Sequence, residues 1–211
     1  MSEDDSACGC HSDENRLATE PAYRRALGIV VALNLGFGFV EAGGGFLADS
    51  QALKADSLDF IGDGSISLLG LLALTWAART RARLALSQGL FLGALGMGVL
   101  GFAAYRALTA TPPEAELMGV IGIAALAVNV TAALILARFR EGGDAQARAI
   151  WLFSRNDALA NMAVIGAAAL VAWTGRAWPD LVVAAGIALL FLHSAFAIVT
   201  DARRDLAASK S

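Results

Sequence analysis

The sequence predicts an all-α membrane protein with six transmembrane helices, and three observations support this prediction. Hydrophobic residues make up 57% of the 211 residues and charged residues only 17%, against roughly 45–50% and about 25% in soluble domains. The apolar residues form six long runs, each near the roughly 20 residues that a helix needs to cross a bilayer. No alternating pattern of strands competes with these runs, and a soluble bundle of six such helices would have almost no polar face for water.

The six runs are separated by short polar breaks. They cover Ala26–Leu47, Leu53–Ala78, Leu84–Leu108, Met118–Ala137, Arg148–Trp173 and Leu181–Thr200. Connections this short predict a compact bundle in which helices adjacent in sequence are antiparallel. We therefore expect a disordered cytoplasmic tail over residues 1–20, a six-helix transmembrane domain over residues 21–202 and a short cytoplasmic tail over residues 203–211.

The distribution of positive charge predicts the orientation of the bundle. Twelve of the sixteen Lys and Arg residues fall in the two tails and in the second-to-third and fourth-to-fifth connections, and such residues gather on the cytoplasmic side. Both termini are therefore expected in the cytoplasm. Residues 1–20 have no apolar stretch typical of a signal peptide. The formal net charge of −3 argues against a nucleic-acid partner, because no basic face is available to neutralise phosphates.

Acidic residues interrupt the second apolar run, which begins "LKADSLDFIGD". Asp59 and Asp63 are four residues apart and so share one helical face. Asp157 and Asn161 repeat that spacing in the fifth run. Carboxylates are costly in hydrocarbon and persist mainly where they face a cavity, a partner or an ion. Two such pairs could converge on one divalent cation, whereas without a cation the carboxylates would repel one another and one would take up a proton.

Other polar residues in the runs have several interpretations. Asn34, Glu41, Asp56 and Asn129 are expected to line a polar pathway. For Asp56, near the start of its helix, capping is the preferred interpretation and a place in the outer vestibule the other. An interhelical polar clamp would also explain buried acids, but a clamp does not require three acids without an internal Lys.

Two segments carry a resemblance to a known family. "LNLGFGFVEAGGGFLADSQALKADSLDFIGD" (Leu33–Asp63) and "GVIGIAALAVNVTAALIL" (Gly119–Leu136) resemble the first two helices and the fourth helix of the cation diffusion facilitator family. The resemblance implies a homodimer of six-helix protomers in a bacterial-type inner membrane. It further implies a non-enzyme without a prosthetic group that exports divalent cations, zinc foremost, in exchange for protons. Asp59, Asp63 and Asp157 match the metal-binding positions of the family.

The fifth helix departs from the family pattern, which has an Arg, a His five residues later and an Asp after four more. Arg148 and Asp157 match, but Phe153 stands at the position of the His. Asn161 is the preferred substitute ligand because it shares a face with Asp157, and Asn156 and His193 are the other candidates. The sequence also resembles a short form without the C-terminal cytoplasmic domain of the family.

The N-terminal motif "CGCH" offers two thiols and an imidazole, Cys8, Cys10 and His11. These three groups fall short of a closed four-ligand zinc site, and a metal-collecting tail and an incidental one remain alternatives. An alternative function is a membrane metal sensor that binds an ion without transporting it. A membrane-embedded metalloenzyme ranks last, because His193 is the only obvious intramembrane base.

Overall fold

The computed structural model describes residues 21–72, 76–109, 111–137, 139 and 145–208, without the side chains of residues 70, 78, 145–156 and 208. All regular structure in these ranges is helical. The helices are α3 (Pro21–Leu47), α4 (Gln51–Leu72), α5 (Ala78–Thr109), α6 (Ala115–Ala137), α7 (Ala145–Thr174) and α8 (Trp178–Ala208). The predicted all-α, six-helix architecture is therefore confirmed.

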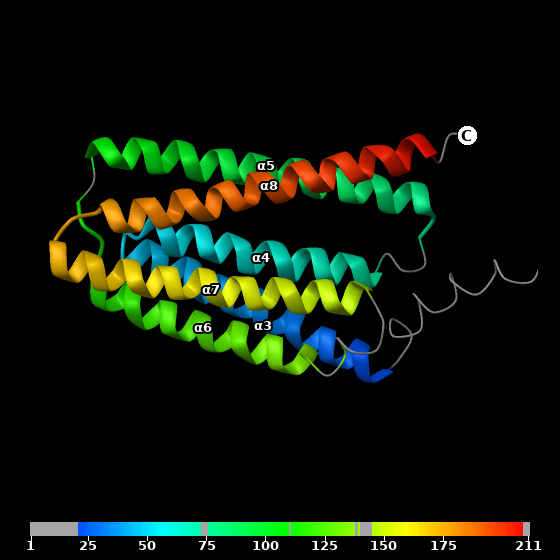
Figure 1. The fold of residues 1–211 in the computed structure, drawn as a ribbon, viewed down its shortest axis with the longest axis horizontal. Helices are drawn as coiled ribbons and strands as arrows, with labels where there is room; N and C mark the ends of the chain where they lie inside the picture. The colour runs from blue at the N-terminus through cyan, green and yellow to red at the C-terminus, as the bar shows by residue number, and fades with distance from the viewer. Residues whose placement is uncertain (1–20, 73–75, 110, 138, 140–144, 209–211) are drawn as a thin grey trace, which may run out of the picture.

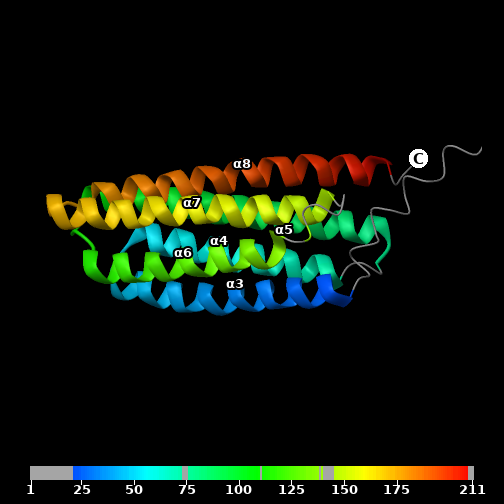
Figure 2. The ribbon, with the colours of Figure 1, turned by 60° about the horizontal axis from the view of Figure 1, so that its bottom comes forward.

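Five of the six helices are long and apolar enough to cross a membrane, and α4 is the exception. Its 22 residues include Lys54, Asp56, Asp59 and Asp63. This helix lies in the middle of the bundle and contacts the other five helices, α3 and α8 most extensively (Figures 1 and 2). A helix that is enclosed by protein tolerates charges that a lipid-facing helix does not, so α4 is the natural carrier of a polar site.

Several helices extend beyond the apolar runs that predicted them. α3 begins at Pro21 rather than Ala26, and α8 continues to Ala208, past the expected domain boundary at residue 202. Ala78, predicted to end the second helix, instead begins α5. The end of an apolar run marks where a helix leaves hydrocarbon, not where its backbone hydrogen bonds stop, and Arg side chains are good helix formers. Pro21 suits a first helical position because its missing N–H has no intrahelical partner there.

The helices fall into a group of four and a pair. α3, α4, α6 and α7 pack together, while α5 lies along α8 beside them. α8 connects the two parts through its contacts with α4 and α7 (Figure 1). The start of α3 and the end of α8 lie at the same end of the bundle, and the turns after α3, α5 and α7 lie at the opposite end (Figures 1 and 2). The latter is called the turn end below.

Seven-residue periodicity directs the polar residues of α3 and α6 into the bundle. On α3 the buried positions include Val30, Asn34, Gly38, Glu41 and Gly45, which follow spacings of three or four residues. On α6 they are Met118, Gly122, Ala125, Asn129, Ala132 and Leu136. This spacing keeps one stripe facing neighbouring helices, so the amides and Glu41 are carried inward together with the apolar residues.

Glycines bring α3 and α4 close together beside these polar residues. A Cβ at Gly38 would lie 2.7 Å from Ile61 Cγ1, and one at Gly45 would lie 3.0 Å from the backbone nitrogen of Lys54. Small residues of this kind allow helix backbones to approach in lipid, where dispersion contacts rather than the hydrophobic effect hold helices together. The approach places the inward face of α3 directly against the acidic helix.

Candidate metal centre

Six side chains from four helices line a small polar pocket inside the four-helix group. They are Asn34 of α3, Asp59, Phe60 and Asp63 of α4, Asn129 of α6 and Asp157 of α7. The three carboxylates that the sequence predicted as metal ligands are therefore in one place. Two neutral amides, which the sequence assigned only to a polar pathway, share the pocket with them.

The pocket lies well inside the bundle. Asp63 is about 18 Å along α4 from Gln51, and Asn34 is about 20 Å along α3 from Leu47, at 1.5 Å per residue. Asn129 is about 21 Å along α6 from Ala115 on the same scale. All three distances start at the turn end, so the helices bring these side chains to nearly the same depth. In a hydrocarbon layer about 30 Å thick, that depth is near the middle.

The three carboxyl groups interact directly. Asp157 lies within hydrogen-bonding reach of both Asp59 and Asp63. Even so, the described residues contain no group of three or more His, Cys, Asp or Glu side chains arranged as a metal cluster. The pocket thus gathers the acidic donors without setting them in coordination geometry. Carboxylate side chains reach such geometry through rotamer changes.

Asn161, predicted to complete the ligand set, makes different contacts. It is fully buried and donates from Nδ2 to the carboxylate of Asp56. Its Oδ1 accepts a hydrogen bond from Asn129 Nδ2 at 2.8 Å. Both ends of the amide are therefore occupied, and Asn161 connects α4, α6 and α7 beside the pocket rather than lining it.

The sequence analysis preferred Asp56 as the cap of α4, but in the structure Asp56 does not cap this helix. Only 1% of it is exposed, and it lies next to Glu41, which is fully buried. Neither oxygen of Glu41 and only one oxygen of Asp56 has a hydrogen-bond partner among the described residues. The two acids form a buried pair between the acidic pocket and the turn end.

The cap of α4 comes from two other residues, one of them far away in sequence. Ser50 Oγ accepts from the backbone nitrogen of Leu53 at 3.1 Å, the standard N-cap contact. Asp180, in the first turn of α8, accepts from Ser50 Oγ at 2.6 Å and from the backbone nitrogens of Gln51 and Ala52 at 2.8 and 3.0 Å. The negative charge lies at the positive end of the α4 dipole, where it is stabilising.

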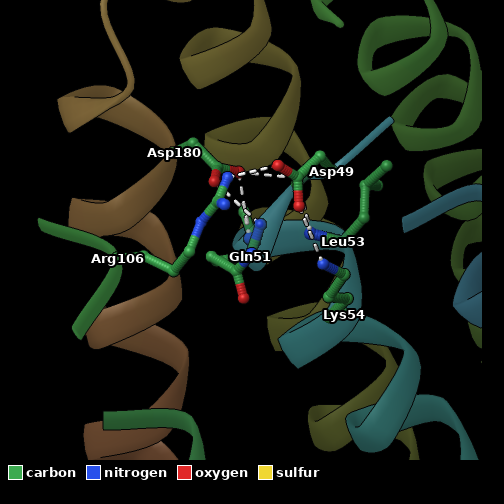
Figure 3. Close-up of polar contacts among 8 residues, drawn as sticks. Asp49, Gln51, Leu53, Lys54, Arg106 and Asp180 are labelled. Atoms are coloured by element: carbon green, nitrogen blue, oxygen red, sulfur yellow. Dashed lines mark hydrogen bonds and ion pairs between the residues drawn. The ribbon is translucent and has the colours of Figure 1, made fainter. Parts of the chain in front are cut away.

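Figure 3 shows this cap beside a second polar cluster at the turn end. Asp49, which has a positive φ of 53°, forms ion pairs with Lys54 and Arg106. Lys54 Nζ also lies 5.1 Å from the ring centroid of Phe46. The sequence analysis assigned no role to Asp180. Its position just after the Trp-Pro pair that opens α8 was the available signal, although nothing in the sequence identified α4 as its target.

The remaining candidate ligands are not in the pocket or lie outside the described residues. His193 is exposed on α8 and does not line the acidic pocket. The side chains of Asn156 and Phe153 are outside the description, as are Cys8, Cys10 and His11. The described part of the chain therefore contributes Asp59, Asp63 and Asp157 with the amides Asn34 and Asn129.

The fold and the pocket together define a multi-pass helical membrane protein with a buried acidic site. Residues 27–207 match the family model described as the cation efflux transmembrane domain, and the chain belongs to this family. This confirms the resemblance found in the sequence.

Two characterised relatives show how far the likeness extends. The chain is 29% identical over 208 residues to the zinc transporter ZitB of Escherichia coli (strain K12), covering 93% of this chain and 66% of that protein. It is 27% identical over 198 residues to the "Cadmium, cobalt and zinc/H(+)-K(+) antiporter" of Bacillus subtilis (strain 168), covering 86% of this chain and 63% of that protein. The chain thus spans just under two thirds of the length of these relatives.

Proposed function

We propose that this chain forms the membrane part of a divalent-cation transporter that exports metal in exchange for protons. The observation that carries the proposal is the pocket itself, in which Asp59, Asp63 and Asp157 converge from α4 and α7. Carboxylates this close favour a divalent cation because it cancels their mutual repulsion. Membership of the cation efflux family supports the same conclusion.

The exchange with protons follows from the ligands. A carboxylate must give up its proton before it binds metal, so metal affinity falls as pH falls and binding releases protons. Protons arriving from the outer side would therefore displace the ion, and metal arriving from the cytoplasm would displace the protons. Movement of helices around a site near mid-membrane would open the pocket to each side in turn.

We further propose that zinc is the foremost substrate, with cobalt and cadmium also carried, as the names of the two relatives suggest. An oxygen-rich shell is harder than one with an imidazole, while the Irving–Williams order favours zinc and cobalt over manganese in almost any shell. Both effects together predict broad selectivity with a weakened preference for zinc.

The proposed setting is a homodimer in a bacterial-type inner membrane with both termini in the cytoplasm. The asymmetry of Lys and Arg supports the orientation, and the start of α3 and the end of α8 share one end of the bundle (Figure 1). To test this orientation, single cysteines are placed at Thr111, in the exposed turn after α5, and at Ser211, with Cys8 and Cys10 replaced by Ser, and are labelled in whole cells with a membrane-impermeant maleimide. Labelling of the C-terminal cysteine in intact cells would reverse the orientation.

Transport is tested with purified protein in proteoliposomes carrying a pH gradient. Zinc, cadmium, cobalt, nickel, manganese and iron(II) are offered in turn, and Asp63→Asn serves as the inactive control. We expect metal flux that depends on the gradient and is lost in the variant. Metal binding without flux would instead support a membrane metal sensor, and equal flux in the Asp63→Asn protein would reject the proposed site.

A further inference from the structure

We propose that Asn34 supplies the fourth metal ligand through its side-chain carbonyl oxygen. This inference rests on the proposed function, since it concerns the shell of the same ion. It differs from the sequence-based assignment, in which Asn161 took that place. The neutral amide of Asn34 on α3 would replace, as a ligand, the imidazole that the family pattern has on the fifth helix.

Three observations distinguish Asn34 from the other amides. It lines the acidic pocket together with Asp59, Asp63 and Asp157. Only 6% of the residue is exposed, and its Oδ1 has no hydrogen-bond donor among the described residues. A buried acceptor without a donor is uncommon and calls for an explanation. A cation held by the three carboxylates would provide a partner for this oxygen.

The other two amides near the pocket already have partners. Asn161 uses its nitrogen on Asp56 and its oxygen on Asn129. Asn129 lines the pocket, but its nitrogen donates to Asn161 and so ties the side chain to the network around Asp56. To bind an ion through its Oδ1, Asn161 would have to give up the hydrogen bond from Asn129 Nδ2, whereas Asn34 would give up no hydrogen bond of its Oδ1.

The chemistry of an amide oxygen suits such a shell. It is a hard, neutral donor of the kind that divalent cations with oxygen preferences accept. It completes four donors without a fourth negative charge, which would increase repulsion in the empty pocket. It also arrives from α3, so an ion bound there would connect α3, α4 and α7.

Metal binding by the purified protein in detergent tests the inference. Zinc, cobalt and manganese affinities are measured by competition with a fluorescent chelator for the wild type, Asn34→Leu, Asn34→Asp and Asp63→Asn. Gln88→Leu is the control, since Gln88 is a half-buried intramembrane amide with an unpartnered Nε2 among the described residues and lies outside the acidic pocket. The ligand-field absorption of bound cobalt(II) reports the coordination shell independently of transport.

We expect Asn34→Leu to weaken metal binding by at least about 10-fold, because even the loss of a residue that only hydrogen-bonds to a ligand costs about that much. The cobalt spectrum should also change. Asn34→Asp should bind at least as tightly as the wild type, and Gln88→Leu should bind as the wild type does. Because Asn34→Asp keeps an oxygen at the position, it still tests the inference if Asn34→Leu does not fold.

The possible failures are separable. Wild-type affinity and an unchanged cobalt spectrum in Asn34→Leu, with binding lost in Asp63→Asn, would overturn the role of Asn34 and leave the acidic site standing. Weaker binding in Asn34→Asp than in the wild type would also count against a ligand at this position. Equal binding in the wild type and Asp63→Asn would instead overturn the proposed function on which the inference rests.

Discussion

Asn161 on α7 donates a hydrogen bond to Asp56 on α4, two residues 105 positions apart in sequence. The two helices run in opposite directions (Figure 1), so each turn forward along α7 meets an earlier turn of α4. Asp157 therefore lies beside Asp59 and Asp63, and Asn161, one turn further on, lies beside Asp56. This pairing places the amide of Asn161 next to the acidic pocket, where its nitrogen is already engaged with Asp56.

The first prediction concerns the stability that this contact provides. Asn161→Leu leaves a buried carboxylate and the amide of Asn129 without partners, which costs about 1–3 kcal/mol for each unsatisfied group. Thermal unfolding in detergent should show a lower midpoint, while Met162→Leu, at an exposed neighbouring position, should not. An unchanged midpoint in Asn161→Leu would contradict the hydrogen-bonded network.

The acidic pocket predicts opposite effects on stability and on binding. Each of Asp59→Asn, Asp63→Asn and Asp157→Asn removes one of three mutually repelling charges, so the metal-free protein should unfold at the same or a higher temperature. The same variants should lose the stabilisation that zinc gives the wild type. Asp201→Asn, on the exposed surface, is the control. Variants that keep the zinc-dependent shift would show that these carboxylates do not hold the ion.

The cap of α4 predicts a coupling between two distant residues. Asp180→Asn and Ser50→Ala each remove part of the cap, and loss of an N-cap alone costs about 0.5–2 kcal/mol. Because the two side chains contact each other at 2.6 Å, the double variant should lose less stability than the two single losses combined. A double-variant cycle on unfolding free energy measures this coupling. Strict additivity would mean that the two side chains act separately.

Close contact between α3 and α4 predicts a contrast between two glycines. Gly38→Ala would place a methyl group 2.7 Å from Ile61 Cγ1, whereas Gly36→Ala meets nothing within 4 Å. We expect Gly38→Ala to push α3 away from α4 and to weaken both stability and metal binding, and Gly36→Ala to be neutral. Overpacking of this kind typically costs about 1–3 kcal/mol. Equal behaviour of the two variants in thermal unfolding would contradict the close approach.

Selectivity should respond to restoring the missing nitrogen ligand. Position 153 is one turn before Asp157 on α7 and therefore shares its face. Phe153→His should raise the preference for zinc over manganese, because imidazole suits zinc better than manganese. Competition among zinc, cobalt and manganese, compared with a Phe153→Leu control, provides the measurement. An unchanged ratio would show that residue 153 does not face the ion.

Long apolar runs allowed the helices of the fold to be predicted from the sequence, while their ends were not. α8 continues to Ala208, past the apolar run, because polar and charged residues can also form a helix. The four-residue spacing placed Asp59 and Asp63 on one face of α4, and the resemblance to the family placed Asp157 with them. The spacing could not decide between Asn161 and Asn34, because that choice depends on how helices far apart in sequence are rotated and staggered against one another.

The cap provided by Asp180 has a consequence for how the chain is made. Because α4 obtains its cap from a residue that the ribosome adds about 130 positions later, the start of the acidic helix remains incomplete until α8 emerges. Until then α4 has only the local part of its cap, the Ser50 Oγ contact with the backbone nitrogen of Leu53. In a Ser50→Cys protein with Cys8 and Cys10 replaced, a nascent chain stalled before residue 178 should react with a maleimide at position 50. The complete chain, in which Ser50 is fully buried, should be protected. The cap of the acidic helix is thus completed only late in the synthesis of this protein.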